Sequence, residues 1–370
     1  MITTKRPVAW SLLCVLALGV SAFGQGRRNQ QQQQQQVQTQ PPKDLLSPRA
    51  QSKDESDAFG ALQKEQAPDK RIELAEAFVA KYPNSDLNQY AQGVRVDSYS
   101  KVGKYKEAIG AAEEAINALV KYGEKIQARA ESDSKLSDKD KEAARKKDKN
   151  AVFVDKDSAE YKTFFSQSEE QIFGLHQFVM NAYQQLNDAP KMMEWGEKAL
   201  GFKPNDVTTL TMLSNVMAER PPASETEKTK QMKRAEELAS QALEALPGFL
   251  SSPEGSKLNA AAQAELTASM HYTLGLIYLH QKRLSSSEAE FLTSIKSKSN
   301  DPIAYYRLGI AYVQDMKNDL GMEALGKSVF LKGVSEAGAR DILKQLWVNK
   351  NKSEQGMEDY IKASGAKIGQ

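Results

Sequence analysis

The sequence predicts an all-α protein built from a stack of antiparallel helix pairs. Beyond Asp54, apolar residues recur every three or four positions, which is the spacing of a helix with one buried face. No stretch alternates apolar and polar residues over the length of a strand. The pattern Leu-Gly-x-x-Tyr occurs at Leu274 and again at Leu308, a shift of 34 residues. A repeat of that length indicates stacked helix pairs.

The first 25 residues have the three parts of a secretory signal peptide. Lys5 and Arg6 form a positive start, an apolar run covers residues 10–20, and small residues follow. Because a membrane span needs roughly 20 apolar residues, we expect cleavage between Ala22 and Gln25 rather than a retained anchor. An uncleaved signal is the alternative, and it is the one route to membrane association. We therefore expect an exported protein, either periplasmic or secreted.

Cleavage removes Cys14, the single cysteine of the chain. Disulfides, thiolate metal sites and cysteine nucleophiles are then excluded. Two of the 50 basic residues, Lys5 and Arg6, also leave with the signal, so 48 basic residues face 48 acidic ones. This balance gives no reason to expect nucleic acid as a partner.

Residues 26–53 are predicted to be a disordered linker, because the glutamine run 30–36 and several prolines offer too little apolar surface to fold. The helical array is expected over residues 54–333. Its clearest helices are Arg71–Lys81, Ala108–Val120, Asp206–Ala218, Met232–Leu246 and Met270–Gln281. Pro83, Pro204 and Pro247 each lie five residues after an apolar or small residue, and each is expected to end one repeat.

The helix pairs resemble the tetratricopeptide-repeat family, whose pattern is an aromatic residue, Leu-Gly, Tyr, a small residue, an aromatic residue and a closing proline. After Gly275, Ser287 takes the small position of the second helix and Phe291 the aromatic position. A weaker copy places Tyr99 nine residues before Ala108, beyond a turn that begins at Gly103. The resemblance implies a tetratricopeptide-repeat superhelix; a generic helical bundle is the alternative.

Small residues are expected where two helices of a pair cross closely. Gly275, Gly309, Ala108 and Ala235 occupy these positions, and larger side chains would push the helices apart.

Three segments depart from the repeat. The turn between Ala218 and Ala235 is about nine residues too long for the family pattern, and the last repeat has about three extra residues near Asn318. Residues 124–150 carry nine basic and seven acidic residues and hardly any apolar ones. We expect a charged insertion over about residues 124–160, as a protruding hairpin or a mobile segment, and a solvated spacer rather than a binding arm.

The C-terminal segment, residues 334–370, no longer matches the repeat. An open stack exposes an apolar face at its end, so a terminal helix carrying Leu343, Leu346 and Trp347 is expected to cap it.

One motif fits a phosphate-binding loop letter for letter. Residues 321–328 read G-x-x-x-x-G-K-S, but such a loop needs a preceding strand, and here a repeat helix precedes strong helix formers. We therefore expect a packed helix and no nucleotide. His271 and His280 lie nine residues apart on opposite faces of one predicted helix, and His176 stands alone, so no metal site is expected. No catalytic residues and no cofactor are predicted.

The remaining candidate is a groove. The resemblance implies that the first helix of each pair lines a concave face that binds protein or peptide partners. The expected partner-binding residues are Asn181, Asn215, Tyr272, Leu276, Leu279, Tyr306, Arg307, Ile310 and Val313. Tyr272 and Tyr306 lie one repeat apart, so they are expected to form a continuous strip. The alternative is that these side chains pack on the neighbouring repeat or on the chain's own ends.

Some members of the family clamp a terminal carboxylate with Lys, Asn and Arg on this face, but the lysines are missing here. The segment 78–85 is similar to repeats of bacterial envelope proteins that help to assemble outer-membrane or peptidoglycan machinery. Two functions stay open. One is a non-catalytic interaction scaffold in the cell envelope, and the other is a permanent structural subunit or assembly factor of an envelope or secretion complex.

Overall fold

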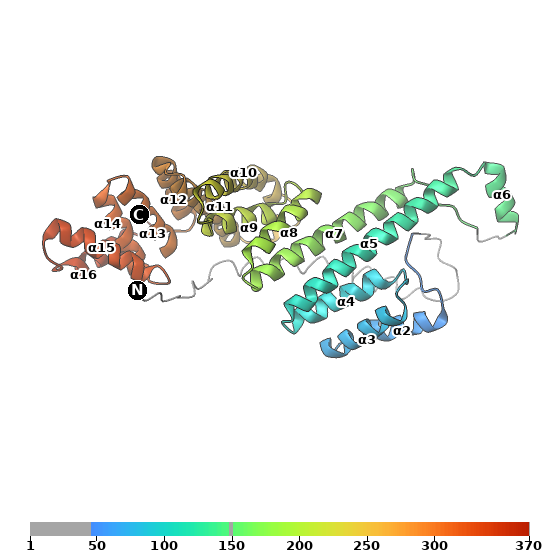
Figure 1. The fold of residues 1–370 in the computed structure, drawn as a ribbon. Helices are drawn as coiled ribbons and strands as arrows, with labels where there is room; N and C mark the ends of the chain where they lie inside the picture. The colour runs from blue at the N-terminus through green and yellow to red at the C-terminus, as the bar shows by residue number, and fades with distance from the viewer. Residues whose placement is uncertain (1–45, 148–150, 370) are drawn as a thin grey trace. The chain divides into compact units, whose positions relative to one another are not determined.

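The computed structural model describes residues 46–147 and 151–369, and every regular element within them is a helix (Figure 1). The predicted signal peptide and most of the predicted linker lie outside these residues. The chain divides into two compact units, whose described parts are residues 46–202 and 203–369. No helix in the described ranges is long and apolar enough to cross a membrane.

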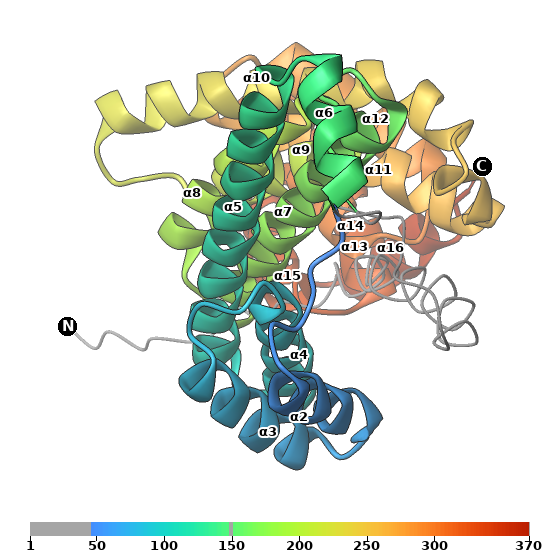
Figure 2. The same ribbon diagram turned by 90° about the vertical axis from the view of Figure 1, so that its right-hand side faces the viewer.

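The unit of residues 46–202 is a series of helices in which neighbours along the chain pack together. The long helices α5 and α7 run side by side in both views (Figures 1 and 2). Its helices are α2 (Lys53–Lys64), α3 (Pro68–Lys81), α4 (Asn88–Lys101), α5 (Tyr105–Ser134), α6 (Asp138–Lys147), α7 (Ala159–Gln185) and α8 (Ala189–Phe202).

The unit of residues 203–369 contains three helix pairs, α9 with α10, α11 with α12 and α13 with α14, followed by two terminal helices. Its helices are α9 (Val207–Glu219), α10 (Glu225–Leu250), η1 (Gly255–Lys257), α11 (Ala260–His280), α12 (Leu284–Ser297), α13 (Pro302–Gln314), α14 (Asn318–Leu331), α15 (Glu336–Asn351) and α16 (Met357–Gly365). The prediction of an all-α fold of antiparallel helix pairs is confirmed.

Glycines bring the helices of a pair into contact at their crossing. A Cβ atom on Gly275 would lie 2.7 Å from the ring of Phe291, and one on Gly309 would lie 2.7 Å from Leu325. Ser287 donates a hydrogen bond from Oγ to the carbonyl oxygen of Gly275 at 2.8 Å, so the small position also ties the two helices together. The close-approach role that the repeat pattern predicts for these glycines is confirmed.

The repeat keeps its register to the end of α14. Gly321 lies 34 residues after Ser287 and takes the same place, with a Cβ position 3.3 Å from the carbonyl oxygen of Gly309. The two inter-helix turns also match, because Lys282 and Met316 both have φ of 60°. The expectation of extra residues near Asn318 is therefore wrong. The small position of the second helix is occupied by Gly321, and with that residue the spacing of the last repeat is regular.

Two further expectations about turns need correction. The residues thought to lengthen the turn before Ala235 are mostly helical, because α10 begins at Glu225 and only residues 220–224 separate it from α9. Pro247 does not end a repeat but lies inside the last turn of α10. A proline there removes only one intrahelical hydrogen bond before the helix ends. By contrast, Pro83 and Pro204 do lie between helices, and Gly103 forms its turn with φ of 74°.

The charged insertion contains the end of α5 and the short helix α6, and it is packed at its base. Helix α5 continues to Ser134, and its Ile126 and Ala130 are buried against Val154 and Leu46. Tyr122 donates a hydrogen bond to the carbonyl oxygen of Leu46 at 3.0 Å, so the end of the predicted linker also packs. Only α6 is solvated along its whole length. In residues 124–134, Ile126 and Ala130 are buried and most other side chains are exposed, so this stretch is solvated except along one packed face.

The terminal helices α15 and α16 cover the apolar face of α14. Leu343 and Ile361 are buried in one cluster with Leu325 and Val329, and Trp347 packs against its edge. The last helix pair therefore has a cap from the chain's own C-terminal segment.

We predict that Gly309→Leu lowers the free energy of unfolding by about 1–3 kcal/mol, because the new side chain overlaps Leu325 at the helix crossing. Gly248→Leu is the matched control, since a Cβ at that exposed helical position meets nothing within 4 Å. Chemical denaturation of both variants measures the difference. Equal stability of the two variants would show that the crossing can widen without cost.

Candidate partner-binding face

The first helices of the three pairs lie next to one another, α9 beside α11 and α11 beside α13. Asn215 on α9 donates a hydrogen bond from Nδ2 to Oγ1 of Thr273 on α11 at 3.2 Å. Corresponding helices of successive pairs thus present one row of side chains.

Three side chains on this row, one from each first helix, meet in what we call the Glu219 cluster. Tyr272 on α11 donates a hydrogen bond from its hydroxyl to Oε1 of Glu219 on α9 at 2.6 Å. Arg307 on α13 donates from Nη2 to the other carboxylate oxygen, Oε2, at 3.3 Å. The Arg307 guanidinium also lies 5.8 Å from the ring centre of Tyr306. The cluster therefore links three successive helix pairs.

Both donors of the cluster stay protonated at neutral pH. Burial and the neighbouring Glu219 carboxylate raise the pKa of the Tyr272 hydroxyl far above its ordinary value. Burial alone would lower the pKa of Arg307, but Tyr272 and Glu219 outweigh it, and the pKa is raised. The cluster is thus a carboxylate held by a neutral hydroxyl donor and a permanent cation.

His280 lies at the edge of the cluster. Its Nε2 atom is 3.0 Å from the carbonyl oxygen of Ala218, the residue before Glu219. Burial lowers the pKa of His280, so the neutral ring donates this hydrogen bond at neutral pH. The end of α9 is therefore held by α11 through backbone as well as side chain.

Two residues expected to contact a partner do not reach the surface. Leu276 is 0% exposed and Leu279 is 8% exposed. Helix α11 packs against α9, α10, α12 and α13, and residues 273–277 are buried without interruption. Because this helix is enclosed on nearly every side, the expectation that these leucines line a groove is wrong.

Other expected residues are partly covered by the chain itself. Tyr306 and Val313 pack against the cluster that contains Leu343, and the Tyr306 hydroxyl lies 3.0 Å from a Cβ position on Gly338 of α15. Ile310 is half-buried on the same helix. Tyr306 and Val313 therefore pack on the chain's own terminal helices and do not form an open strip for a partner.

The remaining expected residues are divided between the units. Tyr272, Arg307 and Asn215 lie together in the unit of residues 203–369. Asn181 is half-buried on α7, in the unit of residues 46–202. Glu219 was missed, because it ends α9 just before a turn and no repeat position marks it.

The motif that fits a phosphate-binding loop lies entirely within α14. Lys327 pairs with Glu323 at 3.0 Å, and Ser328 donates a hydrogen bond to the carbonyl oxygen of Pro302. The expected packed helix is confirmed. The histidines are used locally: His271 contacts Glu290 at 2.7 Å, and His176 lies between the rings of Trp195 and Phe202. No possible metal-binding cluster occurs among the residues described.

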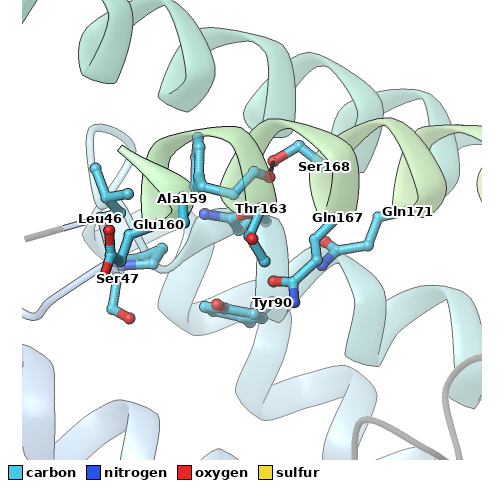
Figure 3. A pocket seen from close by; sticks show the side chains of 12 residues that line it. Leu46, Ser47, Tyr90, Ala159, Glu160, Thr163, Gln167, Ser168 and Gln171 are labelled. Atoms are coloured by element: carbon cyan, nitrogen blue, oxygen red, sulfur yellow. Dashed lines mark hydrogen bonds between the residues drawn. The ribbon is translucent and has the colours of Figure 1, made fainter. Parts of the chain in front are cut away.

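A pocket of about 430 Å³ lies in the unit of residues 46–202. Figure 3 shows Thr163 and Gln167 pointing from α7 toward Tyr90 of α4. Residues 46–48 and further glutamines complete its lining, Glu160 is the one charged lining residue, and no lysine, arginine or histidine lines it. The lining therefore offers no cationic side chain to bind an anion.

No known family model matches this chain, and no curated protein matches it in sequence. Solved structures with a similar chain course include BtubC from P. vanneervenii, with 13% identity, TM-score 0.38 and coverage of 82% of this chain and 94% of that one. A tetratricopeptide repeat protein from Parabacteroides merdae ATCC 43184 has 13% identity, TM-score 0.41 and coverage of 84% and 95%. The APC/C hetero-tetramer Cut9-Hcn1 has 13% identity, TM-score 0.39 and coverage of 88% of this chain and 60% of that one. Likeness this low carries no argument about function.

We predict that Tyr306→Ala lowers the free energy of unfolding by about 1–3 kcal/mol, less than a fully buried ring would lose. The reason is that its ring packs between α13 and α15. Tyr306→Phe keeps the ring and should differ from the wild type by less than about 1 kcal/mol. Chemical denaturation provides the measurement. If Tyr306→Ala has the same free energy of unfolding as the wild type, the Tyr306 ring contributes nothing to packing and is free to contact a partner.

Proposed function

We propose that this protein is a non-catalytic scaffold that binds a protein or peptide partner through the face formed by α9, α11 and α13. The Glu219 cluster carries this proposal. It places a tyrosine and an arginine, residue types that often dominate interface energies, on two adjacent helices, α11 and α13. The Arg307 side chain keeps 29% of its surface exposed and that of Glu219 keeps 32%, so a partner can reach them.

The chemistry of this face supports binding rather than catalysis. Tyr272 and Arg307 hold their protons, and Glu219 is already engaged by both. General acid–base catalysis needs a group with a pKa near the working pH, and neither donor of the cluster has one.

A permanent structural subunit or assembly factor is the second candidate, and a different surface favours it. Met316 is 82% exposed at the turn between α13 and α14, and Leu320, in the first turn of α14, is 50% exposed. Exposed large apolar side chains are candidates for a protein interface. A lasting complex through this turn would leave the Glu219 cluster uninvolved.

We also propose that the protein works outside the cytoplasm, in the periplasm or cell envelope, or in the medium. The three-part signal of residues 1–25 supports this location, and so does the similarity of residues 78–85 to envelope repeats.

Export predicts a mature chain that begins after Ala22 and lacks Cys14. Mass spectrometry of the intact protein, purified from its natural host, measures the N-terminus, and a thiol-reactive probe should leave the protein unlabelled. A full-length chain with a reactive thiol in the cytosolic fraction would refute the proposed location.

Affinity capture followed by mass spectrometry tests the proposed face. We predict that Arg307→Ala loses the partners that the wild type captures, because the cation at the centre of the face is gone. Arg283→Ala is the matched control, since Arg283, in the turn before α12, forms a similar pair with Glu236 of α10 at 2.7 Å. Partners that survive Arg307→Ala but disappear in Met316→Ser would favour the structural-subunit candidate.

A further inference from the structure

We propose that Glu219 is an internal stand-in for the partner, and that the partner's acidic side chain replaces it between Tyr272 and Arg307. This inference rests on the proposed function and adds the chemistry of the partner. It makes the face a receptor for glutamate or aspartate side chains that is occupied by the chain's own carboxylate until a partner arrives.

The geometry already shows which group the site accepts. A hydroxyl from α11 and a guanidinium from α13 converge on the two oxygens of one carboxylate. Neither donor belongs to the helix that supplies the acid, so the donor pair stays in place when the acid leaves. A carboxylate from another chain can therefore meet the same two donors.

The arginine is not saturated by Glu219. A guanidinium has five N–H donors and binds a carboxylate best through two parallel hydrogen bonds. Here the contact to Glu219 is 3.3 Å, longer than the roughly 2.7–2.9 Å of a strong charge-assisted bond. The Arg307 Nε atom is buried and has no hydrogen-bond partner. A better-placed acid can therefore gain contacts that Glu219 does not make.

Glu219 is also poorly placed to compete. It is the last residue of α9, where the helix dipole has its negative end and disfavours a carboxylate. The turn of residues 220–224 follows immediately, so the side chain can swing out without breaking the helix. Displacement costs a hydrogen bond from Tyr272 and a long ion pair, and the incoming acid restores both.

The two charged members of the cluster are not equally easy to displace. A basic partner would have to displace Arg307 from Glu219, and Arg307 lies in the middle of α13 with a buried Nε atom. An acidic partner meets repulsion only from Glu219, and that repulsion ends when Glu219 moves away. The site therefore selects acidic side chains.

The test uses the full mature chain and three octapeptides, acetylated and amidated so that they carry no terminal charge. They alternate serine with glutamate, glutamine or lysine. Fluorescence anisotropy of labelled peptides gives each dissociation constant. For Glu219→Gln we expect about tenfold tighter binding of the glutamate peptide than for the wild type, because the internal competitor loses its charge. Tyr272→Phe combined with Glu219→Gln should lose most of this gain, and Arg307→Ala should bind none.

Glu236→Gln is the matched control. Glu236 on α10 is also held by an arginine, Arg283, and by an amide donor, Gln281, both in the turn between α11 and α12 and outside the Glu219 cluster. It should leave binding of the glutamate peptide unchanged. Thermal melts confirm that each variant is folded, and Tyr272→Phe keeps the ring that packs near Phe291.

The outcomes separate the two proposals. Equal affinity of the wild type and Glu219→Gln for the glutamate peptide overturns the stand-in role, even if capture yields partners that depend on Arg307. Tighter binding of the lysine peptide to the wild type overturns the acidic specificity. If Glu219→Gln gains glutamate-peptide affinity but the wild type captures no partner, the receptor chemistry stands and the scaffold function fails.

Discussion

The close approach of two helices at a glycine is the constraint on which the unit of residues 203–369 depends. At Gly275 and Gly309 the facing helix supplies Phe291 or Leu325 at a distance that leaves no room for a Cβ atom. This contact fixes the second helix of each pair against the first, with the same register 34 residues later. Because the pairs repeat, their first helices present equivalent positions, and three such helices can contribute to one cluster.

The sequence predicted the parts of this fold that local rules control. The spacing of apolar residues predicted the helices, and the repeated Leu-Gly-x-x-Tyr pattern predicted that they pack as antiparallel pairs. It failed where context overrides the local signal. Pro247 fits inside the final turn of α10, and Gly321 serves as a small residue although the family pattern favours alanine there. In α5, a few apolar residues such as Ile126 were enough to pack a stretch that is mostly charged.

The site was harder to predict than the fold, for a physical reason. Repeat spacing shows that Tyr272 and Leu276 lie on one helix, but exposure depends on how many neighbours enclose it. Helix α11 has helices on nearly all sides, so Leu276 is core while Tyr272 reaches the first-helix row. Glu219 forms its contacts 53 and 88 residues further along the chain. No local pattern encodes pairs of that separation.

The Glu219 cluster also connects binding with stability. Its three members come from α9, α11 and α13, so the first helix pair is tied to both of the following pairs by polar contacts as well as by packing. The Arg307–Glu219 contact is a long ion pair with about a third of each side chain exposed, and such a pair contributes little to stability, on the order of 1 kcal/mol or less. The array therefore does not depend on it, and the glycine crossings keep the helices in place when it opens. A weak, displaceable tie on a rigid row of helices suits a surface that has to exchange an internal carboxylate for one from a partner.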